Sequence, residues 1–320
     1  SKRLVFIVDE AHRSTFGEML FTIKNAFPNA LFFGFTGTPI QKENQKKNNT
    51  TAMVFGNELH RYSIADGIRD KNVLGFDPYM VKTYKDGDIR KAVALEQAKA
   101  KTEEEVFTDP KKEKKYYQYM DSSYIPMAGH EESGKYKKGI EDYVSNSQYT
   151  TEEHQRAVVS DVIEHWNTYS RNSKFHAIFA TSSIPEAIKY YQLFKEMKPS
   201  LRVTCLFDPN IDNKGGFEYK EEGLKEILDD YNKLYGSGYD MAKHAEFKKD
   251  VAFRLAHKEN YKGIERTPEK QLDLLIVVDQ MLTGFDSKWV NTLYLDKVIE
   301  YESIIQAFSR TNRLFGNDKP

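Results

Sequence analysis

Short, continuous runs of apolar residues recur along the chain, and most of them lead into a cluster of polar residues. A continuous run without alternation is typical of a strand that is buried on both faces of a parallel sheet. Stretches with the composition of helices lie between the later runs, and this order predicts an α/β fold whose parallel sheets are covered by helices. The apolar runs cover residues 4–8, 31–35, 175–180, 201–207, 274–278 and 292–295, and the helical stretches cover residues 151–169, 185–197 and 221–257.

Two carboxylates follow the first apolar run, in the string Asp9-Glu10-Ala11-His12. Parallel sheets bind ligands at the carboxyl ends of their strands, so these side chains stand where a ligand would lie. One carboxylate can hold Mg²⁺, with water completing its shell, and the next can orient or deprotonate an attacking water. We therefore expect a nucleotide-hydrolysis site in which Asp9 takes the metal and Glu10 the water. An acidic pair that merely ends a strand and solvates a turn is the simpler alternative.

The second apolar run leads into Thr36-Gly37-Thr38-Pro39. We expect its strand to neighbour the first one, so that both deliver polar residues to one edge of the sheet. The glycine lets the backbone approach another group, and the proline fixes the exit of the chain. The hydroxyl groups of Thr36 and Thr38 can bond to His12 and to the backbone. Such a loop can report the state of a bound nucleotide.

Two further polar clusters lie near the end of the sequence. The run at residues 274–278 leads to Leu282-Thr283-Gly284-Phe285-Asp286, and a predicted helix carries Gln306-Ala307-Phe308-Ser309-Arg310-Thr311-Asn312-Arg313. The spacing of Arg310 and Arg313 predicts that they share a helix face. Paired guanidinium groups suit the charge that develops on a transferring γ-phosphoryl group. A solvated or salt-bridged helix end is the alternative for these arginines.

In this order, the four strings resemble motifs II, III, V and VI of superfamily 2 helicases, and in particular those of the motor (R) subunit of type I restriction enzymes. Two more strings, Phe55-Gly56-Asn57-Glu58-Leu59-His60 and Ile64-Ala65-Asp66-Gly67-Ile68-Arg69-Asp70, also resemble that family. The resemblance covers residues 1 to about 80 and about 150 to 320, and it is poor between them.

The resemblance implies two RecA-like lobes of the P-loop NTPase helicase type, with ATP and Mg²⁺ bound between them. It implies that Asp9 holds Mg²⁺, that Glu10 is the catalytic base, and that His12 couples the nucleotide site to Thr36 and Thr38. The activity it implies is the ATP-dependent DNA translocation of a type I site-specific deoxyribonuclease.

The same resemblance assigns residues of the second lobe. Gly284 and Asp286 would lie at the nucleotide cleft. Gln306, Arg310 and Arg313 would reach the phosphates from the second lobe, with one arginine acting as the finger.

DNA contacts are implied as well. Thr283 would lie near the nucleic-acid backbone, and the looser match to motif IV at residues 175–182 ends in Thr181 and Ser182, which could bond a phosphate. A strand that ends in a Thr/Ser turn is common, so an ordinary turn is the alternative for this pair. The partners implied are double-stranded DNA and the methyltransferase and specificity subunits of a restriction-modification complex.

One part of such a motor is missing, namely a Gly-rich, lysine-containing loop that cradles phosphates upstream of the acidic strand. A literal match occurs at Gly129-His130-Glu131-Glu132-Ser133-Gly134-Lys135, but no buried strand precedes it and its glutamates would repel phosphates. Tyr136 also stands where Ser or Thr should reach Mg²⁺. We therefore reject this match and expect a first lobe that is truncated at its N-terminus. The chain alone should bind ATP weakly and hydrolyse it little.

The composition of the chain limits the classes of protein to which it can belong. A net charge of -1 and a pI near 6.7 argue against a basic DNA clamp, although local groups can still track a DNA backbone. With 39% hydrophobic residues and a mean hydropathy of -0.67, no run approaches the length of a membrane span, and no targeting segment is visible. Cys205 is the one cysteine, which excludes an internal disulfide and fits a reducing, cytoplasmic setting.

The organisation changes in the middle of the chain. We expect the end of the first RecA-like domain at residues 1–81, a charged linker or insertion at 82–150, and the second RecA-like domain at 151–320. The insertion interleaves lysines with tyrosines, which could pair and stack with nucleic acid. Neighbouring glutamates favour a solvated surface instead.

Two rival classes of function remain at this point, beside other superfamily 2 helicases or remodellers. A nuclease site would need clustered carboxylates and a lysine, and Asp208 with Glu218 and Lys220 is the one loose candidate. A non-catalytic scaffold that binds DNA or partners is the stronger rival. The intact acidic pair and arginine pair argue against it.

Overall fold

A computed structural model describes residues 4–12, 16–39, 50–144, 149–208, 216–278, 285–299 and 302–316. The chain divides into two compact units. Unit 1 contains residues 1–77, 166–195 and 199–320, and unit 2 contains residues 78–165 and 196–198. The boundaries expected at residues 81 and 150 stay predictions.

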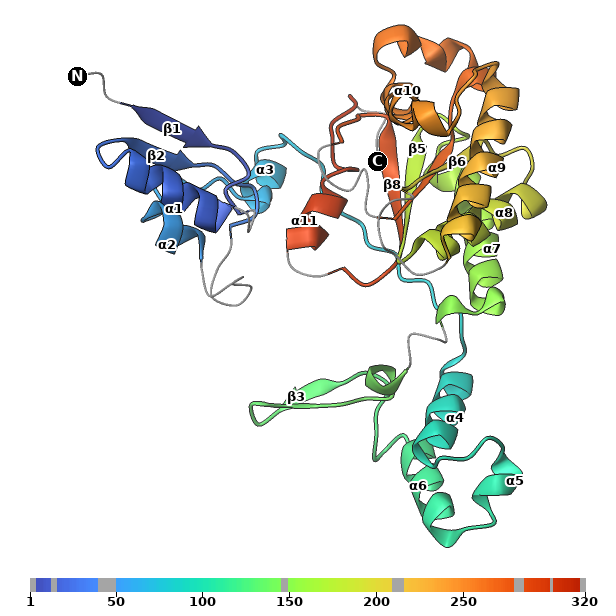
Figure 1. Cartoon of the computed structure of the whole chain (residues 1–320). Coiled ribbons are helices and arrows are strands. Elements are labelled where there is room, and N and C mark those ends of the chain that lie inside the picture. The colour runs from blue at the N-terminus through green and yellow to red at the C-terminus, as the bar shows by residue number, and fades with distance from the viewer. Residues whose placement is uncertain are drawn as a thin grey trace. The chain divides into compact units, whose positions relative to one another are not determined.

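The first part of unit 1 contains a small parallel sheet, coloured blue in Figure 1. Its strands are β1 (Val5–Val8) and β2 (Leu31–Gly34), which pair in parallel from Val5 opposite Leu31 to Val8 opposite Gly34. The two strands are therefore neighbours, as the sequence predicted. The helices of this part are α1 (Phe16–Ala26), α2 (Thr51–Phe55) and α3 (Ile64–Arg69).

This sheet is less buried than the sequence predicted. The ring of Phe6 stacks on Phe32 with centroids 4.8 Å apart, and Gly34 lies against the ring of Phe55 in α2. On the opposite face, Ile7 and its partner Phe33 are exposed, by 72% and 39%. Residues of a strand alternate between faces, so only the face that carries Phe6 and Phe32 is covered. The prediction that these strands are buried on both faces is wrong for the described part of the sheet.

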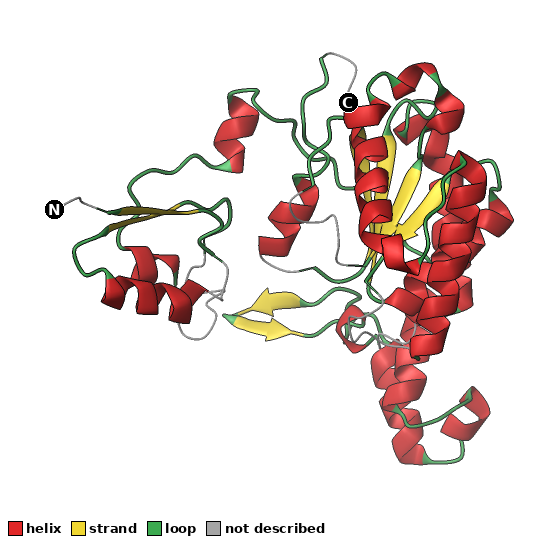
Figure 2. Cartoon of the chain, turned by 45° about the horizontal axis from the view of Figure 1, so that its top comes forward, coloured by secondary structure: helices red, strands yellow, loops and turns green. Residues whose placement is uncertain are grey.

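The second sheet of unit 1 matches the prediction closely. Its four strands all pair in parallel, in the order β6-β7-β5-β8. Every residue of β5 and β7 is buried, as their continuous apolar runs predicted. Figure 2 shows the strands side by side with helices beside them. The strands are β5 (His176–Thr181), β6 (Val203–Leu206), β7 (Leu274–Val277) and β8 (Val290–Asp296).

Helices cover this sheet through large side chains. The ring of Phe179 in β5 contacts Tyr190 and Phe194 in α8, at centroid distances of 4.7 and 6.0 Å. The helices in this part of unit 1 are α8 (Ile184–Met197), α9 (Phe217–Tyr235), α10 (His244–Ala256) and α11 (Glu302–Phe308), and the last residues of α7 (Glu152–Tyr169) also belong to unit 1. Short 3₁₀ helices occupy Met241–Lys243, Glu259–Tyr261, Ile264–Arg266 and Pro268–Lys270.

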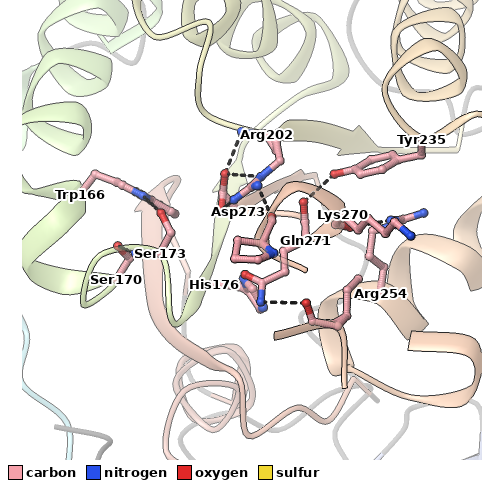
Figure 3. Close-up of polar contacts among 12 residues, drawn as sticks. Trp166, Ser170, Ser173, His176, Arg202, Tyr235, Arg254, Lys270, Gln271 and Asp273 are labelled. Atoms are coloured by element: carbon pink, nitrogen blue, oxygen red, sulfur yellow. Dashed lines mark hydrogen bonds and ion pairs between the residues drawn. The ribbon is translucent and has the colours of Figure 1, made fainter. Parts of the chain in front are cut away.

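A buried ion pair joins two strands of this sheet at their amino ends (Figure 3). Asp273 precedes β7, and its carboxylate accepts hydrogen bonds from the backbone N–H, Nε and a terminal guanidinium nitrogen of Arg202, at 2.9, 2.9 and 2.7 Å. Figure 3 also shows Arg254 donating to the carbonyl oxygen of Lys270. These polar groups lie at the edge opposite to the one where ligands of parallel sheets bind, so they stabilise the fold.

Unit 2 has a hydrophobic core of its own, which includes Val93, Val106, Tyr116 and Ile140. The rejected phosphate-loop match forms part of an antiparallel hairpin, which turns at Ser133 and Gly134 with positive φ angles of 53° and 72°. The described elements of unit 2 are α4 (Asp86–Gln97), α5 (Glu103–Val106), α6 (Pro110–Met120), β3 (His130–Glu132), β4 (Lys135–Lys137), a 3₁₀ helix at Glu141–Tyr143 and most of α7.

The tyrosines of unit 2 are divided between its core and its surface, where Tyr117 and Tyr136 are 53% and 59% exposed. Tyr116 and Tyr119 are buried, and Lys112 lies 2.6 Å from the carboxylate of Glu105. The ion pair of Lys112 agrees with a solvated surface at that residue, and the function of this segment stays a prediction. Within the described residues, no helix combines the length and the apolar composition that crossing a membrane requires.

Candidate functional site

The acidic pair lies in a tight turn directly after β1. The backbone N–H of Phe35 donates to the Val8 carbonyl at 2.8 Å, and that of Ala11 donates to the Phe35 carbonyl at 2.9 Å. Glu10 has a φ of 50°, in the left-handed region that residues with a side chain rarely adopt. Its N–H donates to the Asp9 carboxylate at 2.8 Å. This constrained turn leaves both acidic residues exposed, and strained backbone of this kind is concentrated at functional sites.

His12 is buried beside the threonine loop. Its Nδ1 lies 2.8 Å from the Thr36 hydroxyl oxygen and 3.3 Å from a carboxylate oxygen of Glu10. The Thr36 hydroxyl oxygen also accepts the backbone N–H of Thr38 at 3.0 Å. The structure therefore brings together the residues that the sequence expected to couple, with the closest ring contact going to Thr36.

Gln306, in helix α11, contacts His12. Its side-chain Nε2 lies 3.2 Å from His12 Nε2 and 3.4 Å from the Thr38 hydroxyl oxygen. An amide nitrogen only donates, so His12 Nε2 must accept, and its proton then sits on Nδ1 facing Thr36. This tautomer of His12 is assigned from its hydrogen-bond partners. Gln306 thus connects residues of the first sheet edge to the arginine segment.

The arginine pair does not lie on one helix face, so that prediction is wrong. Helix α11 ends at Phe308, and the chain continues in a turn, with Arg310 N–H donating to the Ala307 carbonyl at 3.1 Å. The hydroxyl of Ser309 donates to the Ile305 carbonyl at 2.6 Å, and that of Thr311 donates to Phe308 at 3.0 Å. The N–H of Ser309 makes the last bond to a carbonyl four residues earlier, at 3.0 Å from that of Ile305, and the next two N–H groups bond only three residues back.

Arg310 is half-buried and oriented by main-chain oxygens. Its Nε donates to the Gln306 carbonyl at 2.9 Å, and a terminal nitrogen donates to the Phe285 carbonyl. Burial, and next the charge of Arg313, lower the pKa of the Arg310 guanidinium, while the negative charges of Asp286 and Glu10 act in the opposite direction. An arginine keeps its charge through such a shift. Glu10 is therefore close enough for its charge to act on Arg310.

Arg313 has a different environment. Its Nε lies 2.7 Å from a carboxylate oxygen of Asp286, and the two side chains are 48% and 57% exposed. The resemblance placed Asp286 at the nucleotide, and in this structure the Asp286 carboxylate holds an arginine.

The remaining predicted residues are less connected to this cluster. Thr181, at the end of β5, is buried, and its hydroxyl donates to the Ser183 carbonyl at 3.2 Å. Ser182 is exposed, and its hydroxyl lies 3.4 Å from the Asp296 carbonyl oxygen. Thr283 and Gly284 lie outside the described residues.

Asp296 is a residue that the sequence analysis missed. It ends β8, and its carboxylate accepts the hydroxyl of Tyr190. The rule that singled out Asp9, a carboxylate directly after an apolar run, would have found it.

A magnesium ion fits Asp9 by its donor chemistry. Among the described residues, no group of three or more His, Cys, Asp or Glu side chains could hold a metal ion. Mg²⁺ in nucleotide sites is commonly held by one or two carboxylates together with phosphate and water, so an exposed single carboxylate is a sufficient protein ligand.

Two regions of the chain match known protein families. Residues 1–115 match the SWI2/SNF2 ATPase family, and residues 173–320 match Type I restriction enzyme subunit R domain 3. The chain therefore combines a helicase-like ATPase region with a region typical of the R subunit. This agrees with the parallel α/β sheets of the structure and confirms the predicted fold class.

Individual relatives agree with the family matches. A type I restriction enzyme endonuclease subunit of Staphylococcus aureus strain COL is 34% identical to this chain. The alignment covers all of the chain and 30% of that subunit. A putative subunit of the same kind from Methanocaldococcus jannaschii is 25% identical over 99% of the chain and 25% of its own length. The resemblance to type I restriction enzyme R subunits is thereby confirmed. The chain spans about 30% of the length of the first of these relatives.

Proposed function

We propose that this chain is the ATP-hydrolysing core of a type I restriction enzyme R subunit and that it drives the translocation of double-stranded DNA. The observation that carries the proposal is the contact of Gln306 with His12. This contact joins the acidic turn after β1 to the segment of Arg310 and Arg313. A base and paired cations that meet in one site are what phosphoryl transfer from ATP requires.

The proposed chemistry divides among these residues. Glu10 accepts a proton from the attacking water, as a general base in contact with His12. Arg310 and Arg313 stabilise the negative charge that develops on the γ-phosphoryl group. Mg²⁺ held by Asp9 would neutralise negative charge on the phosphates. His12 orients Glu10 and the threonine loop.

ATP is proposed to bind between two RecA-like lobes, with Thr36, Thr38, Gly284 and Asp286 at the nucleotide. Nucleotide-dependent closure would then change the grip on DNA. The proposed DNA contacts are Thr181, Ser182 and Thr283. Of these, Ser182 is the exposed hydroxyl in the described part of the chain. The proposed partners are double-stranded DNA and the methyltransferase and specificity subunits.

Glu10→Gln tests this proposal in a full-length subunit that contains the chain. ATP hydrolysis is measured with and without linear double-stranded DNA, and nucleotide and DNA binding are measured separately. Loss of a general base lowers turnover by about a hundredfold or more, while both kinds of binding are retained. The matched control is Glu164→Gln, at an exposed position of α7, which keeps full turnover. Unchanged turnover in Glu10→Gln would remove Glu10 from the mechanism.

A further inference from the structure

The chain that follows α3 lies against the arginine segment, a contact between parts of unit 1 that are far apart in the sequence (Figure 1). The backbone N–H of Leu74 donates to the carbonyl oxygen of Asn312 at 2.8 Å. The ring of Phe76 contacts the ring of Phe308, with centroids 5.4 Å apart and planes inclined by 57°. One polar and one aromatic contact therefore hold the two segments together.

These two contacts lie on either side of Arg310 in the sequence. Phe308 is the last residue of α11 and precedes Arg310 by two positions, while Asn312 follows it by two. Between them the chain has left the helix, and the N–H groups of Arg310 and Thr311 bond to the carbonyls three residues earlier. A short turn of this kind is fixed less firmly than a helix interior, so contacts at its two ends decide where its side chains point.

The contacts are sheltered enough to restrain the turn. Asn312 is buried, and Phe76 and Phe308 are half-buried. An inclined pair of aromatic rings contributes about 0.5–1.5 kcal/mol beyond its buried area in general. The guanidinium of Arg310 is fixed at the same time by the carbonyls of Gln306 and Phe285.

We propose that Phe76 is a positioning residue, which holds the turn at residues 309–312 so that Arg310 faces the phosphates when ATP is hydrolysed. This inference rests on the proposed function. Phe76 contacts Phe308 and not the reacting atoms, so its effect passes through Arg310. Misplacing a charge that acts in the transition state lowers turnover more than it weakens substrate binding.

The experiment measures kcat and KM for ATP in a full-length subunit that contains the chain. Phe76→Ala is expected to lower kcat about tenfold and to leave KM within about twofold. Phe76→Leu keeps an apolar contact with Phe308 and restores most of kcat, which also covers the case in which Phe76→Ala fails to fold. Phe107→Ala removes an aromatic residue of unit 2 that is 55% exposed, and as the control it keeps both constants.

A double-mutant cycle separates positioning from general packing. In an Arg310→Lys background the lysine cannot reproduce the planar guanidinium contacts, so Phe76→Ala should lower kcat little further. An equal tenfold loss in both backgrounds would overturn the proposal, as would a KM that rises with kcat unchanged. If Arg310→Lys itself keeps full turnover, the proposed role of the arginine is wrong and Phe76 has nothing to position. If Arg310→Lys lowers turnover and Phe76→Ala does not, the inference about Phe76 alone fails.

Discussion

The Nε2 atoms of His12 and Gln306 lie 3.2 Å apart, although the two residues are separated by 294 positions in the sequence. His12 also bonds to Thr36, and Gln306 also reaches Thr38, so four side chains form one network. In this network the Gln306 amide nitrogen can donate to the ring only when the histidine proton is on Nδ1. A change at Gln306 should therefore alter the orientation of the histidine beside Glu10.

Replacing Gln306 by leucine keeps the approximate volume and removes both donations. Each hydrogen bond contributes about 0.5–1.5 kcal/mol net, so we expect kcat for ATP to fall about tenfold in a full-length subunit. The measurement is steady-state ATP hydrolysis. Gln192→Leu is the matched control, because this exposed residue of α8 donates to Glu226 far along the chain from the site. Equal activities of the two variants would show that the network does not support turnover.

Gly34→Ala should destabilise the first sheet. A Cβ atom at this position would lie 2.8 Å from the ring of Phe55, which is closer than two carbon atoms can approach without a shift. Overpacking of this kind costs about 1–3 kcal/mol. The loss, measured by thermal unfolding, should largely disappear in the double variant Gly34→Ala with Phe55→Leu.

The control for that measurement is Gly75→Ala, since an added Cβ there meets nothing within 4 Å. If Gly34→Ala is as stable as the original chain, the Phe55 ring moves aside without a cost in stability.

The strands could be predicted from the sequence because burial on both faces leaves no alternation. β5 and β7 are buried throughout, and the apolar runs at 175–180 and 274–278 located them. The same pattern at β1 predicted too much burial, since Ile7 is largely exposed. An apolar run shows which faces of a strand can be buried, and it does not show what covers them.

The site could be predicted only in part. Strand ends located Asp9, Glu10 and the threonine loop, and the family resemblance linked them to α11. The spacing of Arg310 and Arg313 gave the wrong local structure, because spacing alone does not show where a helix ends, and α11 ends at Phe308. The contact of Phe76 with Phe308 joins segments far apart in the sequence, and no local pattern encodes it.

A buried pair of histidines should make the fold sensitive to acid. His176 and His257 have Nε2 atoms 2.7 Å apart, and burial lowers their pKa values to about 3 and about 4. After burial, the positive charges of His257 and Arg202 lower the pKa of His176 further, whereas Glu265 raises the pKa of His257 and Lys288 lowers it. Unfolded histidines bind protons near pH 6.5, so below that pH the unfolded chain takes up protons that the folded chain refuses.

Stability should therefore be complete above pH 6.5 and fall as the pH is lowered towards 4. Urea midpoints measured at pH 7, 5 and 4 should show this loss. His257→Asn should show a smaller loss over the same range, because asparagine tolerates the φ of 51° at this position and does not titrate. His130→Asn, at an exposed position of β3, is the control and should keep the original pH dependence. An identical dependence in His257→Asn would contradict the assignment.

The ion pair of Arg202 with Asp273 should be among the most sensitive sites for stability in unit 1. Asp273 is buried and accepts three hydrogen bonds from Arg202, so Asp273→Asn leaves a guanidinium in a sheltered place without its charged partner. Removing one member of a buried pair costs about 3–5 kcal/mol, whereas replacing both by apolar residues is often neutral. In urea unfolding we therefore expect a large loss for Asp273→Asn and a much smaller one for Arg202→Met with Asp273→Leu. Glu58→Gln, which breaks an exposed pair with Arg61, should leave the midpoint unchanged. Equal losses in the single and double variants would show that the backbone hydrogen bond to Asp273, and not its charge pairing, stabilises the edge.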